Sequence, residues 1–173
     1  MSALVTIRGI ASTLLASLLV IGFIASASGA EADNKAADDL MRQAQVLMSK
    51  GQPEDAVHLL RKAIDLAPNR AELYMLRSRA RDSAGKFEAA LEDATRYVEL
   101  EPNDAYGYLN RARVYMSLDK TGAALQDANK AIALAPNEPD GYYRRADIYL
   151  DMNKDAEAKA DEDKADELDR KAR

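Results

Sequence analysis

The sequence predicts an all-α protein in which antiparallel helix hairpins stack side by side as an α-α solenoid. The main observation is a repeat: one pattern of residues returns every 34 positions, over residues 37–70, 71–104, 105–138 and 139–172. A period of this size is typical of small units that cannot bury their apolar face alone. The other observations are two apolar runs in each copy and a regular pair of breaks that bounds them.

The two apolar runs predict two helices per copy. Apolar residues separated by three or four positions lie on one face of a helix. In the first copy the runs are Leu40, Ala44, Val46 and Leu47, then Ala56, Leu60, Ala63, Ile64 and Leu66.

The break inside each copy falls at an equivalent residue, which is Gly51, Gly85, Asp119 or Asn153. A helix that ends in the left-handed conformation favours Gly, and Asn or Asp tolerate that conformation best among the other residues. We therefore expect the first helix of each hairpin to end there. Pro53 follows at a position where a helix can begin.

The break between copies is a Pro-Asn pair at residues 68–69, 102–103 and 136–137. Proline ends the second helix, and we expect the asparagine to cap the next one. Asn34 is expected to cap the first helix, after a polar lead-in over residues 31–36. Such short connections make neighbouring helices antiparallel.

The fourth copy is degenerate, with Glu162, Asp166 and Arg170 at positions where earlier copies carry apolar residues or proline. An array needs a terminal unit whose outer face is wetted by solvent. We therefore expect residues 154–173 to cap the stack.

Residues 1–30 differ from the rest of the chain, with Arg8 as their single charged side chain and an apolar run over residues 10–25. A basic start, an apolar run and small residues are typical of a secretory signal peptide. Cleavage can follow Ala27 or Ala30, and we favour Ala30; an uncleaved anchor is the alternative, although the run is shorter than the roughly 20 residues of a spanning helix. The mature protein is expected in the periplasm or secreted, without a membrane span.

The amino-acid composition excludes several classes of function. The chain has no Cys, one His and a formal net charge of −5. Thiol chemistry and a His-rich metal site are excluded, and no basic footprint for nucleic acid is present. No catalytic triad or phosphate-cradling Gly loop occurs, so we expect no enzyme activity, no cofactor and no metal.

The copies resemble tetratricopeptide (TPR) repeats, which implies a right-handed superhelix whose first helices line a concave groove. The resemblance covers residues 37–172 and depends on recurrent residues at four positions. These are Leu40, Tyr74, Tyr108 and Tyr142; Ala44, Ser78, Ala112 and Ala146; Ala56, Ala90, Ala124 and Ala158; and the terminal prolines. One departure is Arg81, which replaces a large apolar or aromatic residue.

An arginine and an aspartate recur together, sixteen residues apart, in the last three copies and are both missing from the first. Joint presence and joint absence favour structural ion pairs between the helices of a hairpin over a functional row of arginines. The pairs are Arg77 with Asp93, Arg111 with Asp127, and Arg145 with Asp161.

The resemblance also implies which side chains face the groove. They form a stripe of Met and aromatic residues flanked by two arginines, and they either bind a partner or pack the groove floor. The residues are Met41, Gln45, Met48, Met75, Arg79, Asp82, Leu109, Arg113, Met116, Tyr143, Asp147 and Leu150. Arg79 and Arg113 are expected to receive a carboxylate of the partner. The Lys and Asn clamp with which some TPR domains hold a C-terminal carboxylate is not reproduced.

These features favour a non-catalytic interaction module, an exported scaffold or assembly factor that holds a peptide or protein segment in its groove. The alternative is a structural homo-oligomer in which a second copy of the chain fills the groove.

Overall fold

The computed structural model describes residues 30–172, and these residues form eight helices and no strand. A first helix covers residues 30–49. The others are α2 (Pro53–Leu66), α3 (Ala71–Ser83), α4 (Phe87–Leu100), α5 (Ala105–Ser117), α6 (Thr121–Leu134), α7 (Pro139–Asp151) and α8 (Asp155–Ala172). The expected all-α fold of helix hairpins is confirmed. The expected signal peptide lies outside the described residues.

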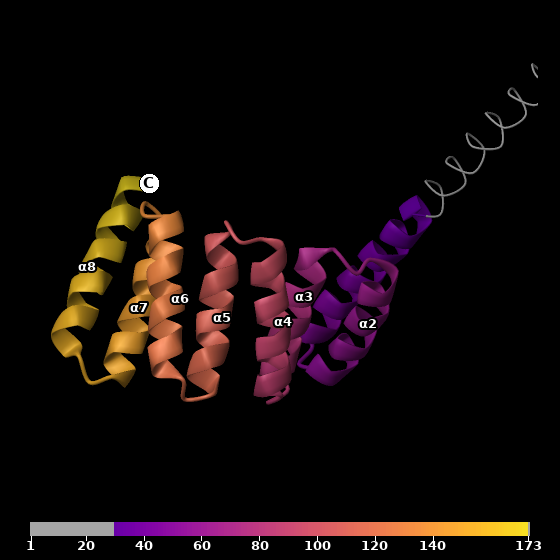
Figure 1. Ribbon diagram of the computed structural model, residues 1–173, viewed down its shortest axis with the longest axis horizontal. Helices are drawn as coiled ribbons and strands as arrows, with labels where there is room; N and C mark the ends of the chain where they lie inside the picture. Colours follow the sequence, from indigo (N-terminus) through magenta and orange to yellow (C-terminus); the bar gives the residue numbers. More distant parts are fainter. Residues whose placement is uncertain (1–29, 173) are drawn as a thin grey trace, which may run out of the picture.

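The hairpins stand in a row from α2 at one end to α8 at the other (Figure 1). Each helix contacts the next one along the chain, and in addition α3 contacts α5 and α5 contacts α7. Within α2–α8 the second helices of successive hairpins make no such contact with each other. The first helices therefore form the inner, concave layer and the second helices form the outer layer.

The hairpins share their interior. The first apolar cluster joins Ala44 and Leu60 of the first hairpin to Leu73 of the second, all fully buried. Another cluster joins Ala112 and Ala124 of the third hairpin to Ile148 of the fourth. Each unit thus completes the core of its neighbour, as the repeat length predicts.

The expected breaks within the hairpins have the expected backbone. The φ angle is +71° at both Gly51 and Gly85, +55° at Asp119 and +56° at Asn153. The residue after each of them donates its N–H back to the last turn of the preceding helix, as Lys86 does to the carbonyl of Arg81 at 2.8 Å.

The expected asparagine caps are wrong. The N-cap residue follows the asparagine by one position in each case and is Arg70, Asp104 or Glu138. Of these three only Asp104 accepts a backbone N–H through its side chain, that of Tyr106 at 3.0 Å. Asn34 is no cap, because the first helix begins at residue 30 and includes the whole expected lead-in, residues 31–36, where no Gly or Pro interrupts it.

Tyr97 and Gly107 fit together at the junction of the second and third hairpins. The Tyr97 ring is buried against Ala71 and Met75. A Cβ atom on Gly107 would lie 2.7 Å from two ring carbons of Tyr97, closer than packed side chains approach. The glycine therefore makes room for the ring.

The last helix of the described residues is α8 (Asp155–Ala172). Its buried face consists of Ala158, Asp161, Ala165 and Leu168, whereas Asp166 and Arg170 are exposed. None of the helices within residues 30–172 has both the length and the apolar composition that crossing a membrane requires.

Candidate functional site

The expected arginine–aspartate pairs lie between the two helices of a hairpin, and each is bidentate. Arg77 donates from Nε and Nη2 to Asp93 at 2.8 and 2.7 Å, and Arg111 does the same to Asp127 at 2.7 and 2.8 Å. Arg145 donates to Asp161 at 2.7 Å through both nitrogens. The aspartates are buried, so these pairs belong to the framework of the array.

Tyrosines surround two of these arginines. The Arg111 guanidinium lies 5.6 Å from the ring centre of Tyr108 and 5.9 Å from that of Tyr115. Arg145 lies 5.8 and 5.9 Å from the equivalent rings, Tyr142 and Tyr149. At these distances the negative face of the ring attracts the cation.

The second hairpin differs, because Arg81 occupies the position of Tyr115 and Tyr149. The Arg81 Nη1 donates to the carbonyl of Ala89 and to Asp93, both at 2.9 Å. Asp93 therefore accepts from two arginines, which explains how a charge replaces an aromatic residue at this position.

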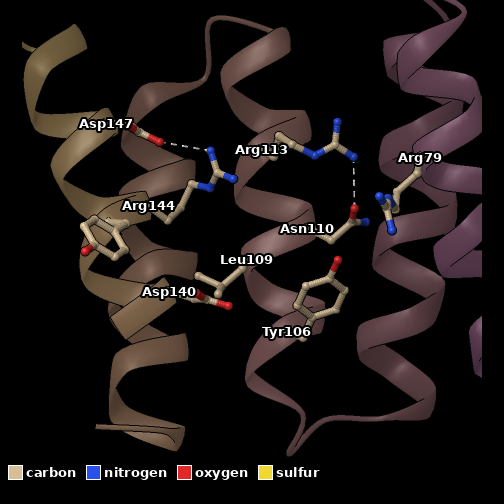
Figure 2. A pocket seen from close by; sticks show the side chains of 9 residues that line it. Arg79, Tyr106, Leu109, Asn110, Arg113, Asp140, Arg144 and Asp147 are labelled. Atoms are coloured by element: carbon tan, nitrogen blue, oxygen red, sulfur yellow. Dashed lines mark hydrogen bonds and ion pairs between the residues drawn. The ribbon is translucent and has the colours of Figure 1, made fainter. Parts of the chain in front are cut away.

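A hollow of about 370 Å³ opens on the inner face, over α3, α5 and α7 (Figure 2). Its lining combines apolar surface with charges of both signs. The residues are Arg79, Tyr106, Leu109, Asn110, Arg113, Asp140, Tyr143, Arg144 and Asp147. A second hollow of about 340 Å³ shares Tyr106, Leu109 and Asp140 with the first and extends toward the ends of α5 and α6. We call the two hollows together the inner groove.

Five of the residues expected in the groove line it: Arg79, Leu109, Arg113, Tyr143 and Asp147. The methionines do not. Met41 and Met48 pack on the first apolar cluster and Met116 on the cluster around Ile148, while Met75 is buried against Tyr97. The packing alternative thus describes the methionines better. Gln45 and Leu150 are exposed and line neither hollow.

Arg113 is engaged within the protein. It forms an ion pair with Asp82 of α3 and donates to the Asn110 side chain at 3.0 Å. Asp82 also accepts from Ser117 at 2.9 Å, and Asn110 donates to the buried Ser78 at 3.2 Å. This polar network joins α3 to α5, so Arg113 and Asp82 hold two inner helices together.

Arg79 has no hydrogen-bond or ion-pair partner among residues 30–172, and its side chain is exposed. The reason lies in the repeat: the residue that corresponds to Asp82 one copy earlier is Met48, which offers no carboxylate. In Figure 2 Arg79 projects from α3 toward the space beside Asn110 and Tyr106. Its charge is therefore available to another molecule.

On the α7 side of the groove, opposite Arg79, the positive and negative charges are closer to balance. Arg144 pairs with Asp147 at 3.2 Å on the same helix, although its buried Nε has no acceptor in the described structure. The Tyr143 hydroxyl approaches Asp166 at 2.8 Å and Asp169 at 2.9 Å. These two hydrogen bonds to carboxylates raise the pKa of Tyr143 above its ordinary value.

Comparison with known sequences identifies the family to which the chain belongs. Profiles described as tetratricopeptide repeat match residues 41–107, 105–138 and 139–171. The chain belongs to the tetratricopeptide repeat family. Among curated proteins none matches it.

Solved structures agree with this TPR assignment. The crystal structure of MamA is 25% identical with a TM-score of 0.70, over 82% of this chain and 83% of MamA. The thermophilic TPR protein TTC0263 of Thermus thermophilus is 21% identical with a TM-score of 0.71, over 77% and 74% of the two chains. The first TPR of Spaghetti (RPAP3), bound to the HSP90 peptide SRMEEVD, is 22% identical with a TM-score of 0.64, over 69% and 95%.

Sequence reasoning missed four residues of the first hollow in this TPR protein: Tyr106, Asn110, Asp140 and Arg144. They lie one turn or less from the expected positions, on the first helices of the third and fourth hairpins. Two signals were present. Tyr106 is an aromatic residue in a first turn where other copies carry Asp38, Glu72 or Asp140, and Asn110 stands where the second copy has Leu76.

The side chains of the groove are suited to binding another molecule. Tyr106 is 48% exposed and supplies apolar surface, while Arg79 supplies guanidinium donors. Within residues 30–172 no group of three or more His, Asp or Glu side chains is placed to hold a metal ion.

Proposed function

We propose that this TPR protein is a non-catalytic scaffold that binds a segment of a partner protein in its inner groove. The observation that carries the proposal is the exposed guanidinium of Arg79 beside the half-exposed ring of Tyr106, in a hollow of about 370 Å³. A surface that combines an aromatic anchor with an uncompensated charge is typical of protein recognition sites.

The partner segment follows from this chemistry. Arg79 would receive a carboxylate of the partner through charge-assisted hydrogen bonds. Tyr106 and Leu109 would contact an apolar side chain a few residues away along the segment. Asp140 and Asp147 on the opposite wall disfavour a second carboxylate there.

A relative supports peptide binding by this fold. The first TPR of RPAP3 is bound to an HSP90 peptide whose sequence, SRMEEVD, contains acidic and apolar residues. We extend to the present chain only the ability of such an array to hold a short segment. The identity of the partner is not carried over from this relative, since function does not follow from the fold.

We further propose that the scaffold works outside the cytoplasm. The pattern of residues 1–30 supports export, and the chain contains no cysteine that a reducing compartment would have to protect. N-terminal sequencing of the exported protein tests this proposal, which expects a mature chain that begins at Glu31.

The experiment for the groove is a crosslinked pull-down from the native host with wild type, Arg79→Glu and Tyr106→Ala. The matched control is Arg96→Glu on the outer helix α4, which reverses the charge of a partly exposed arginine outside the groove. Partners recovered by wild type and by the control, but lost with both groove variants, support the proposal. Equal recovery by all four proteins overturns it.

The alternative function, self-association through the groove, predicts a different outcome. Light scattering of the mature protein would then show an oligomer whose mass falls to that of a monomer with Arg79→Glu. A monomeric wild-type protein at all concentrations excludes this alternative.

A further inference from the structure

A third hollow lies away from the inner groove, where the first two hairpins meet. It has a volume of about 210 Å³ and is lined by α2 and α3. Three of its six residues are arginines: the lining consists of Glu54, Val57, His58, Arg61, Arg77 and Arg81. We call it the arginine pocket. The proposed peptide groove uses none of these residues.

Comparison with the junction of the last two hairpins shows how this pocket differs from it. Two copies further on, Arg145 uses Nε and Nη2 for Asp161 and donates from Nη1 to the Asn129 side chain at 2.7 Å. Arg77 corresponds to Arg145, and Arg61 corresponds to Asn129. An acceptor has thus been replaced by a second guanidinium. The Nη1 of Arg77 has no hydrogen-bond acceptor among residues 30–172, since only its Nε and Nη2 are used, by Asp93.

Arg81 adds a third cation to the same place. Its Nη1 donates to Ala89 and Asp93, and its Nε and Nη2 have no acceptor in the described part of the chain. The equivalent residues in the next two copies are tyrosines, Tyr115 and Tyr149, which carry no charge. The accumulation of arginine is therefore specific to this junction.

The carboxylates nearby do not satisfy these arginines. Asp93 already accepts three hydrogen bonds, two from Arg77 and one from Arg81. Glu54 of the lining and Asp65, one turn beyond Arg61 on α2, form no ion pair with the three arginines, although the charge of Asp65 contributes to the raised pKa of Arg77. The one hydrogen-bond partner of Arg61 among residues 30–172 is the His58 ring, at 3.0 Å. Arg77 and Arg81 share the one carboxylate of Asp93, whereas Arg61 has no ion pair among residues 30–172, so an added anion would reduce the repulsion between the three cations.

We infer that the arginine pocket binds a phosphate group. Guanidinium forks match the oxygens of phosphate in pairs, and three arginines offer more donors than one carboxylate can accept. A phosphate oxygen between Arg61 and Arg77 would take the place that the Asn129 oxygen has beside Arg145. Free phosphate, a small phosphorylated metabolite and a phosphorylated side chain share this chemistry.

The test is a titration of the folded mature protein with inorganic phosphate at low salt, with chloride at matched ionic strength as the reference. The readout is the NMR signal of the arginine Nε–H groups. We expect saturable shifts for Arg77 and Arg81 with phosphate and none with chloride.

Arg61→Asn is the decisive variant, because it removes one cation and restores the acceptor that Asn129 provides to Arg145. Arg61 is exposed, so the variant is expected to fold, which circular dichroism checks. We expect phosphate binding to weaken at least about tenfold, or 1.4 kcal/mol. Arg96→Gln, which changes a partly exposed arginine of α4 that pairs with Glu99, is the control and should bind as wild type does.

Two further ligands identify the source of the phosphate. Tighter binding of a phosphoserine peptide than of inorganic phosphate supports a modified protein as the ligand, and the reverse order supports a free anion or metabolite. The inference is overturned if phosphate produces no saturable shift, if Arg61→Asn binds it as wild type does, or if a peptide with glutamate in place of phosphoserine binds equally well. The arginine pocket and the inner groove share no residue, so failure of the pull-down experiment on the groove would not change the phosphate titration.

Discussion

Arg113 on α5 and Asp82 on α3 form an ion pair that joins two inner helices of consecutive hairpins. Arg79 is the residue equivalent to Arg113 one copy earlier, and it has no such partner in the described chain, because Met48 stands where Asp82 would be required. Two arginines in the same register thus have different roles. One stabilises the stack and the other is available for binding.

The first prediction separates these roles. Arg113→Glu would bring a second carboxylate against Asp82, which is only 11% exposed, and should lower the free energy of unfolding by about 1–3 kcal/mol. Arg79→Glu breaks no ion pair among the described residues and should change the free energy of unfolding by less than about 0.5 kcal/mol. Urea unfolding followed by circular dichroism measures both. A large loss for Arg79→Glu would contradict the assignment.

The second prediction concerns the buried aspartates. Asp93→Ala leaves Arg77 and Arg81 without their shared carboxylate, so it should cost about 3–5 kcal/mol, the usual cost of breaking a buried ion pair. Asp161→Ala should cost less, about 1–3 kcal/mol, because Arg145 keeps its hydrogen bond to Asn129.

The control for the aspartates is Asp163→Ala. Asp163 is exposed, and its one ion pair among residues 30–172 is with Lys159, so its loss should change the free energy of unfolding by no more than about 0.5 kcal/mol. Urea midpoints that fall equally for Asp93→Ala and Asp161→Ala would show that the second arginine on Asp93 adds nothing.

The third prediction tests the fit of Tyr97 against Gly107. Gly107→Ala places a Cβ atom 2.7 Å from the ring and should cost about 1–3 kcal/mol. In a Tyr97→Ala background the same change should be neutral or stabilising, since alanine is the better helix former. Thermal and urea unfolding of the four proteins of this cycle measure the coupling between the two sites.

Gly122→Ala is the matched control for this cycle. Gly122 also lies in a helix, but a Cβ atom there would meet nothing within 4 Å. The change should stabilise the protein by about 0.5–1 kcal/mol. If Gly107→Ala behaved like Gly122→Ala, the close approach of Tyr97 would not be a constraint.

The hairpins could be predicted because their cause is local and repeated. A residue such as Gly85 or Pro102 determines a helix end through its own backbone, and the period of 34 shows each unit four times. The cap at Asp104 was harder, since Asn103 and Asp104 are both good caps and the choice depends on where the helix axis begins. The pairing of Tyr97 with Gly107 could not be predicted, because it arises only between stacked hairpins.

The candidate site could be predicted only in part for the same reason. The register of the repeat placed Arg79 and Leu109 on the inner face, where both line the first hollow. It did not distinguish exposed from buried positions, so Met75 was expected as a binding residue although it is buried. Whether an arginine is paired depends on the residue that faces it from the first helix of the preceding hairpin. This residue is Asp82 for Arg113 and Met48 for Arg79. A comparison of facing positions between copies, rather than of equivalent positions, would have shown this difference.

The last prediction tests the left-handed turn between the helices of the second hairpin. Gly85 has φ of +71°, and no atom lies within 4 Å of the place where its Cβ would be, so any cost of substitution comes from the backbone. Gly85→Ala should therefore lower the free energy of unfolding by about 1–2 kcal/mol. Gly85→Asn should cost less, because asparagine tolerates this conformation and occupies it at Asn153 with φ of +56°. Urea unfolding of the two variants beside wild type measures the difference, and an alanine variant at least as stable as the asparagine variant would show that the turn does not require a left-handed residue.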